Sequence, residues 1–147
     1  MAGDAMQPLV GQVSLPVQVR FADVDMAGHV HNSVYLHWFE LARMRFLEQV
    51  VPAGNDWSEQ GLILARNEVD HRMPVRLQDQ VESAAWCSAI GRSSFDLSYR
   101  IRRTGGGPAG VCAEGRSVLV CFDYTLQKSR PIPHPWLSRL EALLIAT

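Results

Sequence analysis

VRFADVDMAGHVHNSVYLHWFELARMRFLEQV, residues 19–50, is the stretch of sequence that decides the fold. Apolar and polar residues alternate over 17–21, which predicts a short strand. A glycine-centred turn follows, and then a long apolar run predicts a helix from about Ser33 to Val50. Two carboxylates, Asp23 and Asp25, therefore stand between the predicted strand and the predicted helix.

The start of this helix is a candidate catalytic half-site. The first backbone N–H groups of a helix have no intrahelical partner and carry partial positive charge, so they can bind an oxygen on which negative charge develops. Asp25 lies shortly before the helix start at Asn32. The sequence thus predicts an acid beside an oxyanion-binding helix end.

The length and the charge limit the classes of protein to consider. We expect one domain over residues 15–147 after a loose N-terminal tail over 1–14, because 147 residues suffice for one ordinary core. The chain has 14 basic and 15 acidic residues and a net charge of -1, which gives no basic surface for nucleic acid. We therefore expect no nucleic-acid partner.

The cysteines and the apolar runs indicate a soluble, cytoplasmic protein. Cys87, Cys112 and Cys121 are odd in number and show no CxxC spacing, so we expect reduced, buried thiols rather than disulfides or structural zinc. We expect no signal peptide, and no membrane span, because no run approaches ~20 apolar residues.

The rest of the chain predicts an α+β fold. Four strands joined by hairpin-like turns follow the long helix, and a short C-terminal helix closes the chain; their ranges are 62–72, 81–90, 95–102, 111–124 and 136–146. The long helix is apolar on most of its circumference, so we expect an antiparallel sheet to enclose it. Such a sheet has an open edge, which favours pairing with a second copy in a homodimer.

Three segments of the sequence resemble a known family. FADVDMAGHVHNSVYLHWFELAR (21–43), VDHRMPVRLQDQV (69–81) and GRSSFDLSYRI (91–101) are similar to the hot-dog-fold acyl-CoA thioesterases of the 4-hydroxybenzoyl-CoA thioesterase class, including the Tol–Pal-associated bacterial enzymes. The resemblance implies a helix wrapped by a five-stranded antiparallel sheet. It also implies hydrolysis of acyl-CoA or acyl-carrier-protein thioesters, and homodimers or tetramers built from two dimers.

The resemblance also assigns roles to single residues. Asp25 matches the family's catalytic carboxylate, acting as nucleophile or as general base, and Asn32 matches the residue whose backbone N–H faces the thioester carbonyl. The active site is expected at the dimer interface, and no cofactor is expected beyond the coenzyme A of the substrate. The candidate substrate-binding residues are His29, His31, Tyr35 and, as a phosphate contact in a hairpin turn, Arg92.

Other roles for residues near the turn remain open. Asp23 suits a hydrogen bond to the turn backbone, with a partner acid as the alternative. His29 and His31 form an HxH pair beside two acids, but no third well-spaced ligand follows, so we expect no metal. Glu40 suits either an ion pair with its helix neighbours Arg43 or His37, or a second catalytic carboxylate.

Alternative functions also remain. A hot-dog hydratase or dehydratase would use a histidine and an acid on 3-hydroxyacyl thioesters, and a non-catalytic hot-dog module would only bind acyl-CoA or a protein. The run Gly-His-Val-His-Asn differs from the more aromatic turn of the 4-hydroxybenzoyl enzymes, which leaves the acyl group open. No Gly-x-Ser-x-Gly elbow, phosphate-binding loop or dinucleotide fingerprint occurs in the sequence.

Overall fold

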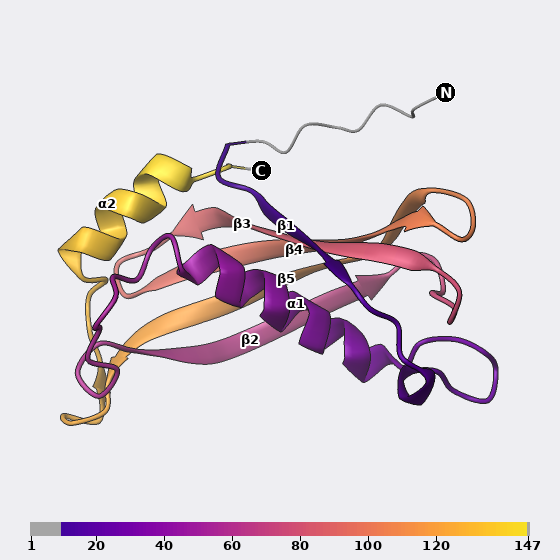
Figure 1. Cartoon of the computed structure of the whole chain (residues 1–147). Helices are drawn as coiled ribbons and strands as arrows, with labels where there is room; N and C mark the ends of the chain where they lie inside the picture. The colour runs from indigo at the N-terminus through magenta and orange to yellow at the C-terminus, as the bar shows by residue number, and fades with distance from the viewer. Residues whose placement is uncertain (1–9, 147) are drawn as a thin grey trace.

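The computed structural model describes residues 10–146 and consists of one sheet with a long helix across it (Figure 1). The shorter helix lies beyond the C-terminal end of the long one. The elements in chain order are β1 (Val13–Val17), the 3-10 helix η1 (Phe21–Asp23), α1 (Asn32–Leu47), β2 (Gly61–His71), β3 (Gln80–Ile90), β4 (Ser94–Gly105), β5 (Gly110–Asp123), β6 (Lys128–Ser129) and α2 (His134–Leu143).

The sheet is antiparallel throughout. Its strand order is β1-β3-β4-β5-β2, and the two-residue strand β6 pairs with β5. The neighbours β3, β4 and β5 are consecutive in the chain and are joined by hairpins, as their alternating apolar and polar residues predict. The predicted α+β fold, in which an antiparallel sheet wraps a long central helix and a short C-terminal helix follows, is confirmed.

The predicted strand over 17–21 is wrong in its position. The strand is Val13–Val17, and the chain then turns into η1, where Phe21 is 86% exposed. The alternation in this segment misleads, because the Asp23 N–H donates to the Arg20 carbonyl and the Asp23 carboxylate accepts the Arg20 N–H, which closes a turn. Residues 1–9 of the predicted tail lie outside the described residues. The tail was expected to extend to residue 14, but β1 already begins at Val13.

The core lies between α1 and the concave side of the sheet. The Phe39 ring stacks on the Tyr99 ring of β4 at 4.5 Å between centroids and 10° between planes. On the opposite side of α1 the helix is less enclosed than predicted, because Leu41 and Met44 are 47% and 58% exposed. A partly uncovered apolar helix face therefore remains on this chain.

The two sheet edges differ. β1 has only five residues and contains Pro16, which suits an edge because proline lacks the N–H that a second neighbour would need. Beyond β1, the Ile145 N–H donates to the Cys87 carbonyl, so the segment after α2 covers part of the β3 edge. β2 is an eleven-residue strand that pairs only with β5 within the described part of the chain.

The three cysteine side chains are buried in the fold, as predicted. Cys87, Cys112 and Cys121 are buried and free, and burial raises the pKa of all three thiols, to about 11 for Cys87 and Cys121. Over residues 10–146, neither helix has the length and apolar composition that crossing a membrane requires.

Candidate active site

Asp25 lies in a tight turn that holds its carboxylate by backbone groups. The turn is closed by a bridge between Val24 and Val30 and by hydrogen bonds from the Asp25 N–H to the His29 carbonyl (2.8 Å) and from the Gly28 N–H to the Asp25 carbonyl (3.0 Å). Gly28 adopts a φ of 80°, which glycine tolerates without strain. The turn thus fixes the backbone from which the Asp25 side chain projects.

The surroundings of the Asp25 carboxylate favour its ionised form. Its Oδ1 accepts the N–H groups of Ala27 (2.9 Å) and His29 (3.1 Å), and the side chain is exposed. The hydrogen bond from His29, with a further one from Ala27, lowers the pKa of Asp25 below its ordinary value. Within the described residues the Oδ2 atom has no hydrogen-bond partner, so it is free to face a substrate or a water molecule.

Asp23 has the opposite surroundings. Its side chain is 2% exposed and accepts hydrogen bonds from the Arg20 backbone N–H (2.8 Å) and from Nε and Nη2 of the Arg20 guanidinium (3.1 and 2.8 Å). The Arg20 guanidinium is the main cause of the lowered pKa of Asp23. The backbone carbonyl of Asp23 also accepts a hydrogen bond from the His31 N–H at 2.8 Å. Asp23 therefore anchors the turn to the start of α1, with its charge already paired.

The start of α1 leaves two backbone donors free. His31 is the N-cap residue and its side chain makes no capping hydrogen bond, while the Val34 N–H donates to the His31 carbonyl. Among the described residues, the N–H groups of Asn32 and Ser33 have no partner. The helix dipole adds partial positive charge at this point, so the two donors can bind an oxyanion.

A cavity of about 260 Å³ lies at the start of α1, where Asn32 is one of its lining residues. It lies between the start of α1 and the end of β2, and its lining combines three predicted residues with a second wall that sequence reasoning missed. The predicted residues are His29, Asn32 and Tyr35, and the missed ones are His71, Arg72, Met73 and Pro74.

The position of the second cavity wall, residues 71–74, follows from the pairing of β2 with β5. The His71 ring contacts the buried Tyr35 ring edge-on, with 4.7 Å between centroids. Burial raises the pKa of the Tyr35 hydroxyl, and a hydrogen bond from the Val75 backbone acts in the opposite direction. His71 pairs with Ala113 of β5, and this register brings the end of β2 beside the α1 start. No local motif around His71 signals this contact.

Three predicted site residues, Asp25, His31 and Arg92, are not among the residues that line this cavity. Asp25 lies in the turn that precedes the lining residue His29. His31 is exposed at the N-cap of α1 and does not line the cavity. Arg92 lies in the β3–β4 turn, which is at the other end of the sheet: β3 begins beside Val17 and ends at Ile90. A single chain therefore does not bring Arg92 together with Asp25.

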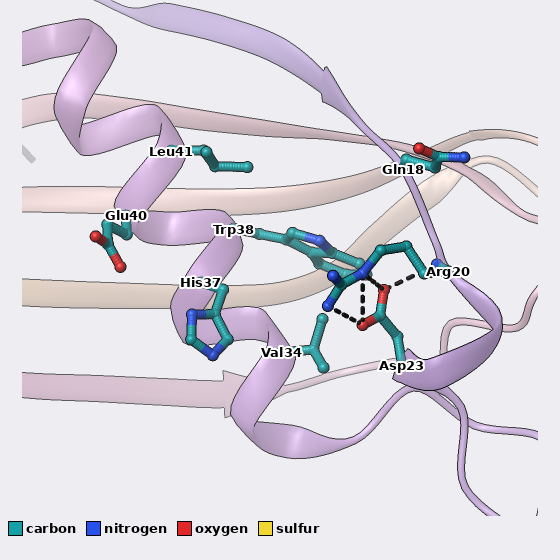
Figure 2. Close-up of a pocket in the computed structure, with 8 residues that line it drawn as sticks. All are labelled: Gln18, Arg20, Asp23, Val34, His37, Trp38, Glu40 and Leu41. Carbon is teal, nitrogen blue, oxygen red and sulfur yellow. Dashed lines mark hydrogen bonds and ion pairs between the residues drawn. The ribbon is translucent and has the colours of Figure 1, made fainter.

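A larger cavity of about 540 Å³ lies on the other side of α1, against the segment that follows β1 (Figure 2). Figure 2 shows the Arg20 guanidinium hydrogen-bonded to Asp23, and both residues line the cavity with Trp38. Glu40 lines this cavity, away from the free N–H groups. This cavity has two carboxylates: Arg20 neutralises Asp23, and Glu40 lies beyond the first turn of α1. Neither is a free acid beside the start of the helix, so we assign the site to the smaller cavity.

The remaining predictions concern helix partners and metal ligands. Within residues 10–146, Glu40 forms no ion pair with Arg43 or His37, the two partners expected for it. Arg43 Nη1 instead donates to the Tyr99 hydroxyl at 3.2 Å. Among residues 10–146, no three His, Cys, Asp or Glu side chains gather in a way that could hold a metal ion.

Comparisons with known proteins agree with the geometry. A family model described as the thioesterase-like superfamily matches residues 19–140. The acyl-CoA thioester hydrolase YbgC of Escherichia coli O6:H1 is 25% identical over 125 residues, 80% of this chain and 87% of that protein.

Two solved structures are also similar. A thioesterase from Thermus thermophilus, complexed with coenzyme A and zinc, is 35% identical with a TM-score of 0.76 and covers 88% of this chain and 92% of that one. A predicted thioesterase from Bacillus stearothermophilus is 24% identical with a TM-score of 0.81 over 92% and 98% of the two chains.

Proposed function

Since the chain belongs to the thioesterase-like superfamily, we propose that it hydrolyses acyl-CoA thioesters to the free acid and coenzyme A. The observation that carries the proposal is that the turn which presents an ionised, exposed carboxylate leads directly to a helix start with unpartnered N–H groups, and that this helix start lines a cavity. Asp25 supplies the carboxylate, and Asn32 supplies the N–H at the helix start.

The proposed reaction uses these two groups in sequence. The thioester carbonyl oxygen accepts the Asn32 N–H, which stabilises the negative charge that develops as the carbonyl carbon is attacked. Asp25 either attacks this carbon itself or removes a proton from an attacking water molecule. The C–S bond then breaks, and the sulfur of coenzyme A leaves as a thiolate, which in the general-base route takes up the proton that Asp25 removed from water. If Asp25 attacks, water hydrolyses the resulting mixed anhydride and restores the carboxylate.

The proposal requires no group beyond the protein and the coenzyme A of the substrate. Asp25 stays ionised through the neutral range because backbone N–H groups lower its pKa, so a base is present without a metal-bound water. The free thiols of the three buried cysteines suit a reducing cytoplasm, which is where we place the enzyme.

The first experiment replaces Asp25 by asparagine. Asp25→Asn keeps the size of the side chain and its acceptor oxygen for the Ala27 and His29 N–H groups, but removes the charge. We expect kcat on a panel of short, medium, long and aromatic acyl-CoAs to fall on the order of 10²–10⁴-fold.

Glu141→Gln is the control for this experiment. Glu141 is an exposed carboxylate on α2, and the segment after α2 covers the sheet edge opposite β2. The Glu141→Gln variant should have the activity of the wild type. Unchanged hydrolysis in a folded Asp25→Asn variant would contradict the proposed mechanism.

A homodimer through β2 is part of the proposal. If two β2 strands pair antiparallel about a two-fold axis, the Gly61 end of one strand meets the His71 end of the other. Ile63 and Ser94 both pair with Val120, so the β3–β4 turn lies at the Gly61 end. This arrangement carries the Arg92 turn of the second copy toward the cavity, where its guanidinium would contact a substrate phosphate.

A further inference from the structure

A buried ion pair lies at the end of the sheet that carries the cavity. Arg103 Nε is 3.0 Å from Asp79 Oδ2, and the two side chains are 8% and 2% exposed. It is the only ion pair within residues 10–146 in which both side chains are buried. Desolvating two charges is costly unless their remaining hydrogen-bonding groups are also satisfied, so the surroundings of Arg103 decide what the pair does.

The Arg103 guanidinium joins three segments of the chain. Nη2 donates to the Pro74 carbonyl (2.5 Å) and Nη1 donates to the Pro108 carbonyl (3.3 Å). Asp79 Oδ2 also accepts the Arg76 backbone N–H (2.9 Å). One side chain of β4 therefore holds both ends of the 74–79 loop.

This loop forms part of the cavity and supports the turn that presents Asp25. Met73 and Pro74 line the cavity, and the next residue, Val75, accepts the Val30 N–H through its carbonyl at 2.8 Å. Val30 in turn bridges to Val24, the residue before Asp25. A short series of hydrogen bonds thus connects Arg103 to the catalytic turn, while Arg103 itself does not line the cavity.

From these contacts we infer that Arg103, oriented by Asp79, is a positioning residue for the reaction. The inference rests on the proposed function, since it concerns the same site. Arginine presents donors in several fixed directions, and here three of them reach Asp79, Pro74 and Pro108. The compact ammonium group of lysine cannot reach three acceptors that lie in such different directions, so the loop loses part of its support although the charge is kept.

The variant that tests the inference is Arg103→Lys. We expect kcat to fall about 10- to 100-fold with a much smaller change in KM, because displacements of about 1 Å at a reacting group have effects of this size. Hydrolysis of acyl-CoA is measured at a temperature where thermal unfolding shows the variant to be fully folded.

A second core variant separates positioning from loss of stability. Leu140→Ala removes a fully buried side chain on α2, far from the loop in the fold, and should lower the melting temperature without lowering kcat. If Arg103→Lys keeps the wild-type kcat, or loses no more than Leu140→Ala does, Arg103 has no positioning role.

Two further measurements keep the inference testable on their own. The double variant Asp79→Asn, Arg103→Gln removes both charges of the buried pair and leaves neither one unpaired. It should therefore fold and still show the loss of kcat. Hydrogen exchange at the Val30 amide, which donates to Val75, requires no activity. We expect faster exchange there in Arg103→Lys than in Leu140→Ala, and equal protection in both would overturn the inference. Wild-type protein that hydrolyses no acyl-CoA would instead contradict the proposed function.

Discussion

Two aspartates that are two positions apart in the sequence have opposite surroundings in the fold. Asp23 turns inward, where Arg20 pairs its charge, and Asp25 turns outward, where only backbone N–H groups contact it. Both pKa values are lowered, but only Asp25 keeps an oxygen available for chemistry. The local backbone, rather than the residue type, therefore determines which acid can react.

The pH dependence of hydrolysis follows from the lowered pKa of Asp25. The reaction needs the ionised carboxylate, so activity is present above the pKa of Asp25 and is lost as pH falls through it. We expect kcat/KM to stay level from neutral pH down to about pH 5 and to fall only below pH ~4, the ordinary value for aspartate. An acid limb near pH ~6.5, where an imidazole titrates, would contradict Asp25 as the reacting group.

Asp23→Asn should affect stability rather than the chemical step. The charged hydrogen bonds to Arg20 contribute about 1–2 kcal/mol, since Asp23 is buried but Arg20 is largely exposed. Because the folded-state pKa is lowered, this stabilisation is present above the unfolded-state pKa and is lost as pH falls through the folded-state pKa.

Urea unfolding of the wild type and of Asp23→Asn at several pH values measures this effect. The difference in the free energy of unfolding should be constant above about pH 5 and should shrink below pH ~4. A difference that is independent of pH would mean that the charge of Asp23 does not stabilise the fold.

At the scale of elements, α1 approaches the sheet where β5 has no side chain. A Cβ atom at Gly115 would lie 2.6 Å from the Glu68 carbonyl oxygen and would collide with the Phe39 ring. Phe39 stacks on Tyr99, so it has no free space to move into. Gly115 therefore sets the distance between the central helix and the sheet.

Gly115→Ala should destabilise the fold by about 1–3 kcal/mol, because it overpacks this contact. Phe39→Leu removes the ring atoms that the new methyl group would meet. In a double-mutant cycle measured by urea unfolding, the two changes should cost less together than the sum of their separate effects, by about 0.5–3 kcal/mol. Strict additivity would show that the helix shifts freely at this point.

The sequence allowed the elements to be predicted better than the contacts between them. Periodicity located α1 and the strands β2 to β5, since apolar spacing reports burial directly. It failed at residues 17–21, where the hydrogen bonds between Arg20 and Asp23 make a turn within an alternating pattern. The family motif pointed to Asp25 and Asn32, but His71 and Arg103 depend on strand pairing, which no local spacing reveals.

At the scale of the whole molecule, one edge of the sheet is left uncovered by residues 10–146. β1 is short, contains Pro16 and is continued by the C-terminal segment, whereas β2 is long and presents a largely exposed edge. Leu64 of β2 is 40% exposed. An exposed apolar side chain on an unpaired edge strand favours association with another β2 strand.

Leu64→Lys should separate the proposed dimer. The charged side chain opposes burial of the β2 edge, and the variant should fold because Leu64 is already partly exposed in the single chain. Sedimentation velocity should give the mass of the dimer for the wild type and a species near 16.4 kDa for the variant. Because the second copy would bring the Arg92 turn to the cavity, kcat/KM for acyl-CoA should fall about tenfold or more, mainly through KM.

Ser14→Lys is the matched control, since Ser14 is exposed on the short β1 edge. It adds the same charge and should leave both the mass and kcat/KM unchanged. If the wild type sediments as a monomer with full activity, the site is complete in one chain and the Arg92 turn has no part in it. If Leu64→Lys remains a dimer, the second copy associates through another surface, and the proposed approach of the Arg92 turn to the cavity is wrong.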